Sequence, residues 1–312
     1  MKQACKRLIL PHILLTVLII CIVFVPNSRP TARHYTSFLA ATAIMEGLFL
    51  LFVFKNKPQY ECCCSRAGTG PFDIISIVWV LLIAWELSTS VFNIAHPVLI
   101  PCPENVFDTF VQQWDVILKN IMYSLSLLLA GFIIGQAAAL TLGTAAGWIP
   151  RLRSLAYPIA NVMAPIPPIV FSPYLVAIMP TFRSASLIVI VFGVFWPAFL
   201  NTIIRITKIE PNILDSARML NPKPLSMITH ILLPYVFKGA VSSLKVSLTT
   251  SMIMLNFAEL MGATHGMGHY IQNSIAYANY THAVAGILTI GIVVTVLSII
   301  ADKLQKVLIR WH

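Results

Sequence analysis

Charged residues are scarce in this sequence: Asp, Glu, Lys and Arg make up 10% of its 312 residues, whereas hydrophobic residues make up 58%. The mean hydropathy of +0.83 lies outside the usual range for soluble domains. About 20 apolar residues are needed to cross a hydrocarbon core, where helices satisfy their own backbone hydrogen bonds. We therefore expect an all-α integral membrane protein with about eight transmembrane helices. The apolar runs lie at residues 8–25, 36–54, 73–92, 121–147, 155–179, 184–204, 236–258 and 283–301.

Several motifs of other protein classes are also missing. The chain has no G-x-x-x-x-G-K-[ST] phosphate loop, so it cannot bind ATP by that route. Its histidines are scattered and form no Ser/His/Asp or multi-histidine cluster at one membrane depth, which argues against an enzyme. No repeat is visible between the halves of the C-terminal part, which weakens the case for an inverted-repeat secondary transporter. A secondary transporter that works without an ATPase stays as an alternative function.

The sequence also gives little support to a metal site. Cys62, Cys63 and Cys64 are adjacent and lack the two-residue spacing of common zinc sites. His265 and His269 stand four residues apart, but the glycines between and beside them favour a loop. We expect no metal.

The distribution of the basic residues predicts the topology. The formal net charge is +10, and most of the 21 Lys and Arg residues fall in segments that are cytoplasmic if the N-terminus is inside. The two longest outer loops, 93–118 and 262–282, contain no Lys or Arg. The positive-inside rule therefore predicts that both termini lie in the cytoplasm. The charge reflects topology and does not indicate a nucleic-acid partner.

Small residues and prolines mark two of the apolar runs. Glycines recur four residues apart at both ends of the run at 121–147, which predicts close packing against another helix; they are Gly131, Gly135, Gly143 and Gly147. Prolines interrupt the run at 155–179, and a broken helix at membrane depth is tolerated when it is buried in protein or faces a wet cavity. Either a packing kink or a neighbouring transport path would explain them.

Two ionisable residues of the apolar runs each allow two interpretations of their role. Lys245 could attract an anion in transit or extend its ammonium toward the cytoplasm. Glu259 precedes a glycine-rich loop, which it could hold by hydrogen bonds, or it could take part in gating. The candidates for the translocation path are Pro165, Pro167, Pro168, Ser172, Asn201, Lys245 and Glu259.

A polar, basic insert separates two of the long apolar runs, at residues 206–234. Pro211 suits the first turn of a short amphipathic helix whose apolar residues recur at helical spacing up to Leu220. Asn221 tolerates the left-handed conformation and Pro222 disfavours continuation, so we expect the helix to end there. A second helix can begin at Pro224. The insert is predicted to face water and to contact a soluble partner.

The insert resembles the cytoplasmic loop of the transmembrane permease subunits of binding-protein-dependent ABC importers. That loop follows the pattern E-A-A, three residues, G, nine residues, I-x-L-P. Asp215-Ser216-Ala217, Asn221 and Ile231-Leu232-Leu233-Pro234 keep every spacing. Asp215, Ser216 and Asn221 replace the Glu, Ala and Gly of the pattern. The residues expected to couple to an ATPase are Asp215, Ser216, Ala217, Arg218, Leu220, Asn221, Pro222, Ile231, Leu233 and Pro234.

The resemblance extends over about residues 72–312. Pro165-Ile166-Pro167-Pro168, the stretch Phe195–Thr202, and Ala258-Glu259 with the following glycines look like the branch that serves nitrate, sulfonate, taurine and bicarbonate. That branch also includes permeases for pyrimidine vitamin precursors. The resemblance thus implies a path for a small anionic solute, with a vitamin precursor such as a pyrimidine as the alternative.

The resemblance further implies the organisation of the transporter. Residues 1–71 would form a two-helix extension with a cytoplasmic loop, and residues 72–312 a six-helix type I ABC importer permease core. The chain would be a non-catalytic subunit of a bacterial plasma membrane transporter and bind no cofactor. Its expected partners are a second permease copy, two copies of an ABC ATPase that binds ATP and Mg, a substrate-binding protein and the lipid bilayer.

Overall fold

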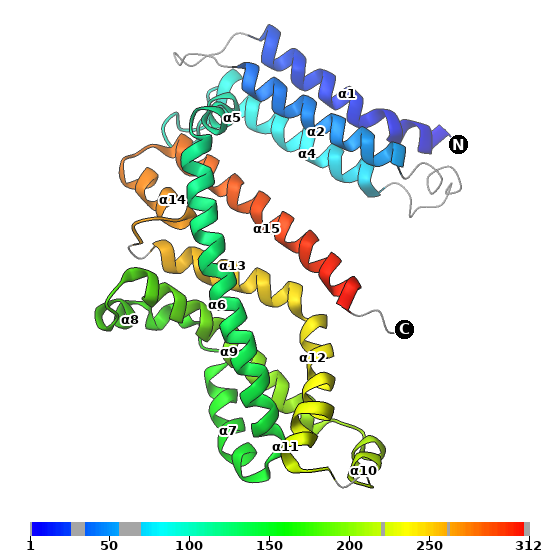
Figure 1. Cartoon of the computed structure of the whole chain (residues 1–312). Coiled ribbons are helices and arrows are strands. Elements are labelled where there is room, and N and C mark those ends of the chain that lie inside the picture. The colour runs from blue at the N-terminus through cyan, green and yellow to red at the C-terminus, as the bar shows by residue number, and fades with distance from the viewer. Residues whose placement is uncertain (1, 26–34, 56–69, 220–221, 261–262, 309–312) are drawn as a thin grey trace. The chain divides into compact units, whose positions relative to one another are not determined.

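The computed structural model describes residues 2–25, 35–55, 70–219, 222–260 and 263–308, and these residues form helices and connections without a strand (Figure 1). Within these ranges, five helices are long and apolar enough to cross a membrane, and the number is seven if each of two bent pairs of helices counts as one span. Helix α1 (Lys2–Phe24) contributes a shorter apolar stretch, Leu10–Phe24. The fold is therefore the all-α membrane protein that the composition predicts, and the two bent pairs replace two of the straight spans.

The chain forms two compact units, and the first contains Met1–Ile117 and Asn273–Ala285. Its helices are α1, α2 (Tyr35–Lys55), α4 (Gly70–Glu86) with a π-helical end at Leu87–Val91, and α5 (Pro103–Gln112). Helix α4 packs against α1, and α5 packs against α2. Residue 71 lies within this unit, and the expected division into an extension and a permease core stays a prediction. The triplet Cys62–Cys64 lies outside the described residues.

The first unit has its own apolar core. Leu18, Ile22, Phe38 and Trp79 are fully buried there. The ring centroids of Phe38 and Phe107 lie 5.0 Å apart. The Nδ1 atom of His12 lies 2.6 Å from an oxygen of the buried Glu46 carboxylate.

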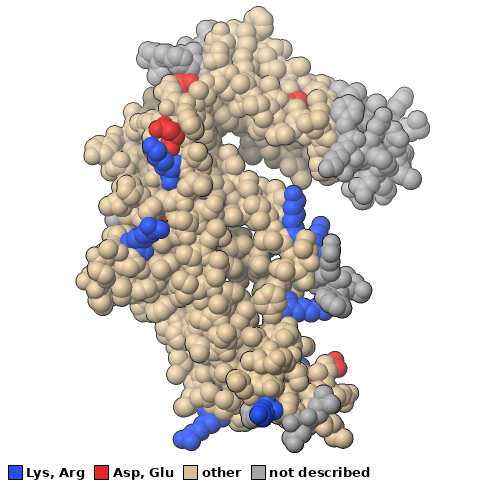
Figure 2. All heavy atoms as spheres, in the orientation of Figure 1, with Lys and Arg blue, Asp and Glu red and all other residues tan. Residues whose placement is uncertain are grey.

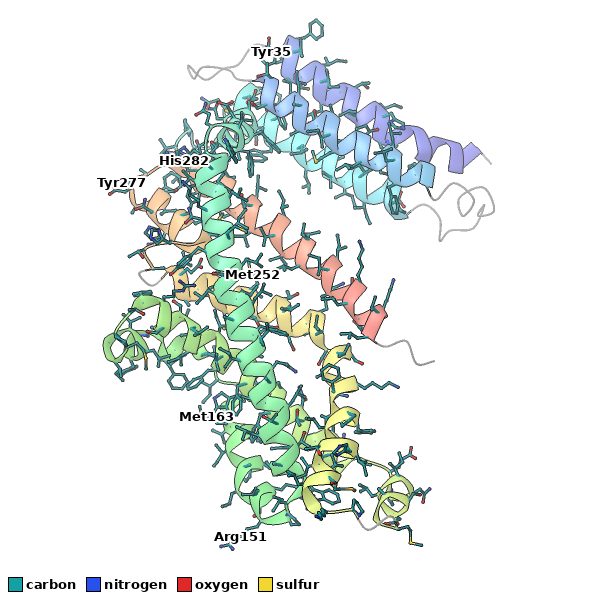
Figure 3. The ribbon with its side chains drawn as sticks, in the orientation of Figure 1. Tyr35, Arg151, Met163, Met252, Tyr277 and His282 are labelled. Atoms are coloured by element: carbon teal, nitrogen blue, oxygen red, sulfur yellow. The ribbon has the colours of Figure 1, made fainter. Side chains whose placement is uncertain are left out.

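The second unit, Leu118–Gln272 with Gly286–His312, contains most residues of the remaining helices, three of which have one end in the first unit. They are α6 (Trp114–Trp148), α7 (Pro150–Met163), α8 (Ser172–Ile178), α9 (Phe182–Thr207), α10 (Pro211–Met219), α11 (Pro224–Ser226), α12 (Leu233–Ser242), α13 (Leu244–Leu260), α14 (Met267–Ala276) and α15 (Tyr280–Leu308). Arg151 and Met163 mark the two ends of α7 in Figure 3. Leu128, Ile190, Met252 and Leu255 belong to a core shared by α6, α9 and α13.

The glycines of α6 pack closely against α9, as their spacing predicts. Gly131 faces Ile190, Gly135 faces Val194, Gly143 faces Thr202 and Gly147 faces Ile206. A Cβ atom at any of the four glycines would come within 3.0 Å of a side chain or backbone atom of α9. The partner is 59 positions further along the chain in every pair, so the two helices run in the same direction and in fixed register.

Both interrupted spans break close to prolines or serine. Helix α7 and the segment Pro168–Ile178 meet at 86°, across the linker that contains Pro165 and Pro167. The segment Met227–Ser242 and helix α13 meet at 65°, where Ser243 separates them. The predicted proline kink is therefore present, whereas the second bend has no proline signal in the sequence.

Candidate functional site

Helix α10 of the insert is anchored through one apolar face. Ala217 is 8% exposed and joins a core cluster with Ile209, Met227 and Leu232, and Leu214 packs against the same cluster. The cluster also includes residues from the C-terminal parts of α6 and α9. Because these contacts come from three segments, the insert is held against the helical bundle by side-chain packing.

Other large apolar side chains of the insert are exposed. Ile213 is 45% exposed, Leu225 is 71% exposed and Met219 is 88% exposed. Asp215 and Ser216 are also exposed on α10. Large apolar side chains that are exposed on a polar segment are candidates for contact with a partner.

The residues expected to couple to an ATPase are distributed over both faces. Ala217 is buried, Ile231, Leu233 and Pro222 are partly buried, and Asp215, Ser216 and Pro234 are exposed. Arg218 belongs to the backbone of α10, and its side chain lies outside the described part of the structure. Leu220 and Asn221 lie outside the described residues. The helix ends at Met219, close to the predicted stop.

The insert continues into the bundle without a break. From Pro224 the chain forms α11, then a π-helix at Met227–Leu232, then α12. Pro234 has no backbone N–H and would clash with a carbonyl of the preceding turn in a regular α-helix. The wider π-helical turn just before it accommodates this residue. The second predicted helix is therefore longer than the sequence indicated, because it runs on to Ser242.

A cavity of about 160 Å³ lies in the second unit, between α6, α9 and the bent pair α12 and α13. Much of its wall is polar, with Gln136, Asn201, Ser247 and Thr250 among the residues that line it. The residues of α9 on this wall run from Gly193 to Arg205, which at 1.5 Å per residue is about 18 Å of helix. This volume holds several water molecules or a small solute.

Some of the residues predicted for the translocation path lie at this cavity, and others lie elsewhere. Asn201 lines the cavity, and Pro168 packs beside Gly193, which also lines it. Ser172 is buried, whereas Pro165 and Pro167 are exposed; none of these three lines the cavity. Sequence reasoning missed Gln136, Arg205 and the hydroxyl residues of α13. Their only sequence signal is a helical spacing of polar residues, such as Ser243, Ser247 and Thr250.

Lys245 has a specific partner. Its Nζ atom lies 2.7 Å from Oδ2 of Asp302 on α15, and both side chains are nearly half exposed. A carboxylate at this distance balances the ammonium charge, so an anion in transit would have to compete with Asp302.

Glu259 is 1% exposed and hydrogen-bonds the loop that follows α13. Its carboxylate accepts a hydrogen bond from the Ser124 hydroxyl at 2.7 Å and another from the Gly268 N–H at 2.8 Å. The Ser124 oxygen in turn accepts from the Met267 N–H at 2.9 Å. The start of α14 therefore meets a carboxylate, which a helix N-terminus favours.

His265 and His269 occupy the same region. The His265 ring packs edge-on against Tyr123, with 5.6 Å between ring centroids. Partial burial, and then the nearby His265, lower the pKa of His269. Within the described ranges, no group of three or more His, Cys, Asp or Glu residues is placed to hold a metal ion.

Comparison with known proteins agrees with this arrangement. Residues 139–311 match the family described as binding-protein-dependent transport system inner membrane component. The chain is 22% identical over 250 residues to the taurine transport system permease protein TauC of Escherichia coli (strain K12), covering 78% of this chain and 88% of that protein. It is 22% identical over 235 residues to the putative aliphatic sulfonates transport permease protein SsuC of Bacillus subtilis (strain 168), covering 75% and 85%.

Two further similarities extend the comparison. The nitrate import permease protein NrtB of Leptolyngbya laminosa is 23% identical over 230 residues, which cover 69% of this chain and 79% of that protein. A solved inward-facing structure of the MetNI methionine ABC transporter superposes with a TM-score of 0.56 at 17% identity, covering 64% of this chain and 99% of the other. This structural likeness concerns the fold.

The membrane-spanning helices and the anchored insert define a multi-pass transport subunit of the membrane. The chain belongs to the family of binding-protein-dependent transport system inner membrane components. It is a permease subunit of an ATP-driven ABC importer, and a separate ATPase subunit hydrolyses the ATP.

Proposed function

We propose that α10 and the exposed start of α11 are the surface on which the ATPase docks, and that the polar cavity is part of the path of a small anionic solute. The observation that supports this most is the unbroken helical connection from the exposed insert to the cavity wall. Leu225 is exposed at the start of that connection, and Val236 and Ala240 of α12 line the cavity at its other end.

This connection supplies a mechanism for alternating access. The apolar face of α10 is packed against the bundle, so a force on its exposed face reaches α12 directly. Because α12 and α13 meet at a 65° bend beside the cavity, a rotation of α12 changes the width of the cavity. Closure of two ATPases around ATP and Mg would then open and close the path from the cytoplasmic side.

The proposed solute class rests on two observations. The names of similar proteins refer to aliphatic sulfonates, taurine and nitrate, which are small and carry oxyanion groups or are oxyanions. The cavity wall combines amides, hydroxyls and one guanidinium, which are groups that bind an oxyanion. We further propose that a binding protein delivers the solute, that two permease copies form the path, and that both termini lie in the cytoplasm.

Co-purification of the ATPase tests the docking surface. Asp215→Arg and Met219→Glu change exposed side chains of α10, so the permease should still insert and fold while ATPase recovery falls at least about tenfold. Lys119→Glu is the matched control, because it reverses an exposed charge near the start of α6. Full ATPase recovery with both insert variants would contradict the proposed dock.

Uptake of radiolabelled taurine, nitrate and methanesulfonate tests the solute class. The importer should be reconstituted in vesicles with its ATPase and its binding protein. ATP-dependent accumulation of at least one of these anions is expected. If the vesicles accumulate none of them, the proposed solute class is wrong.

A further inference from the structure

We propose that Arg205 is the residue of this permease that binds the anionic group of the solute at the insert end of the cavity. The inference rests on the proposed function, since it assumes that the cavity belongs to the solute path. It differs from the expectation drawn from sequence, in which Lys245 was the candidate cation.

The first argument is the charge balance of the cavity. Arg205 is the cation among the described residues that line it, and none of those residues is Asp or Glu. No carboxylate of a described residue lies within ion-pair distance of the Arg205 guanidinium. Lys245, in contrast, is paired with Asp302 at 2.7 Å. The positive charge that faces the cavity is therefore available to a guest.

The second argument is the way in which the guanidinium is positioned. It lies directly against Gly239 of α12, where an added Cβ would overlap its Nη1 and Cζ atoms. A residue with any side chain at position 239 would push Arg205 away. Arg205 also lies in the last turn of α9, where the helix dipole favours a cation. The site therefore holds a planar guanidinium, which can donate two hydrogen bonds at once to an oxyanion.

The third argument is the surroundings of the guanidinium along the cavity. Asn201 lies one helical turn before it on α9, and Ser243 and Ser247 line the facing wall. The Asn201 amide and the Ser247 hydroxyl can donate hydrogen bonds without adding charge, whereas the Ser243 hydroxyl donates to the Gly239 and Ala240 carbonyls. Further along, the buried Oε1 atom of Gln136 has no hydrogen-bond partner among the described residues. This oxygen accepts hydrogen bonds, so it would be satisfied by a water molecule in the cavity or by the ammonium group of taurine, and not by the oxyanion itself.

The fourth argument links the site to α12. Gly239 sits in the middle of α12, which continues the insert. A movement of α12 would remove the backbone surface on which the guanidinium rests, and so change how strongly Arg205 holds an anion. The solute would be bound in one state of the insert and released in the other.

Transport measurements on charge variants test this proposal, with the complete importer and its binding protein in vesicles. Arg205→Gln should raise the concentration of taurine, nitrate or methanesulfonate that gives half-maximal uptake by at least about tenfold, and co-purification of the ATPase shows whether the variant still assembles. Arg205→Lys should retain part of the affinity. Lys208→Gln is the matched control, since Lys208 follows on the same helix end but lines a different hollow.

Gly239→Ala supplies a second variant that leaves Arg205 in the sequence. Alanine is a better helix former than glycine, so α12 should fold normally. Displacement of the guanidinium should nevertheless weaken uptake in the same direction as Arg205→Gln.

Chemical modification of the Arg205→Cys variant tests whether uptake depends on the positive charge at this position or on the shape of the side chain. Uptake by Arg205→Cys should recover when the thiol is modified with 2-aminoethyl methanethiosulfonate, which adds an ammonium, and should not recover with the 2-sulfonatoethyl reagent. The unsubstituted chain treated with both reagents controls for its own cysteines. Equal recovery with both reagents would overturn the assignment.

The outcomes distinguish this inference from the function on which it rests. Accumulation of an anion by the unsubstituted importer with no change in Arg205→Gln would overturn the role of Arg205 and leave the proposed function intact. Failure of the unsubstituted importer to accumulate any of the three anions would overturn both.

Discussion

The Ser124 hydroxyl on α6 donates a 2.7 Å hydrogen bond to the carboxylate of Glu259 on α13, and the same oxygen accepts one from the Met267 N–H. Two residues 135 positions apart thus connect two spans with the start of α14. This contact supplies hydrogen-bond partners to a carboxyl group that is buried at the end of a span.

Removal of this hydroxyl should destabilise the second unit. Ser124→Ala leaves a buried carboxylate and the Met267 N–H with fewer partners, so we expect a loss of about 1.5–3 kcal/mol in the free energy of unfolding. Ser126→Ala is the control, because the exposed Ser126 hydroxyl bonds only the Tyr123 carbonyl of its own helix. Denaturant unfolding in detergent measures both. Equal stability of the two variants would contradict a role for Ser124.

Gly266 should not tolerate a side chain. Its φ of +113° lies outside the conformations of ordinary residues, and a Cβ atom would overlap the Glu259 carboxylate. We expect Gly266→Ala to cost about 1–3 kcal/mol from the backbone alone. Gly291→Ala on α15 is the control, since nothing lies within 4 Å of its Cβ position. Thermal unfolding in detergent should separate the two variants, and a neutral Gly266→Ala would mean that the loop is placed differently.

The contact between α6 and α9 should be sensitive to a single methyl group. A Cβ at Gly143 would lie 2.8 Å from the Cβ of Thr202, an atom that cannot move without the helix. Gly143→Ala should therefore cost about 1–3 kcal/mol as overpacking, although alanine favours helix formation. Gly47→Ala, with open space around its Cβ position, should not destabilise the chain. A stability equal to that of the unsubstituted protein would show that the helices separate easily.

Two neighbouring residues of α10 should respond differently to the same charge. Ala217 is 8% exposed and packs in the core cluster, whereas Ser216 is exposed. Ala217→Asp places a carboxylate among apolar side chains, and α10 should detach because that burial is unfavourable. Ser216→Asp should leave it in place. Amide hydrogen exchange of the segment 211–219 measures the difference, and equal protection in both variants would contradict the packing of this face.

The pair of Lys245 and Asp302 should contribute little to stability. Both side chains are nearly half exposed, so solvent screening limits the coupling to about 0–1 kcal/mol. A double-mutant cycle with Lys245→Gln and Asp302→Asn measures this coupling. We also expect Lys245→Gln to change anion uptake less than Arg205→Gln does. A larger change in anion uptake with Lys245→Gln than with Arg205→Gln would indicate that Lys245 is the main cation of the path.

Local patterns in the sequence were sufficient to predict the insert and the glycine contact. Pro211, Pro222 and Pro224 restrict the backbone near themselves, and the structure begins or ends helices close to each. The four glycines of α6 follow one face of a helix, so their role in close packing can be predicted without knowing the partner. Their partner helix, α9, became visible only in the fold.

The polar cavity depends on contacts that no local pattern reveals. Gln136, Asn201 and Ser247 come from three helices far apart in the sequence, and each alone resembles an ordinary polar residue in a span. The ion pair of Lys245 joins residues 57 positions apart, so its charge could not be assigned to a partner in advance. The bend at Ser243 has no proline to predict it.

The constant offset of 59 positions between the glycines of α6 and their neighbours on α9 has a mechanical consequence. Sliding either helix by one residue would bring side chains into collision at four levels, so we expect the two helices to move together during a transport cycle. The 65° bend between α12 and α13 lies outside this rigid pair, so we expect the second unit to change shape there.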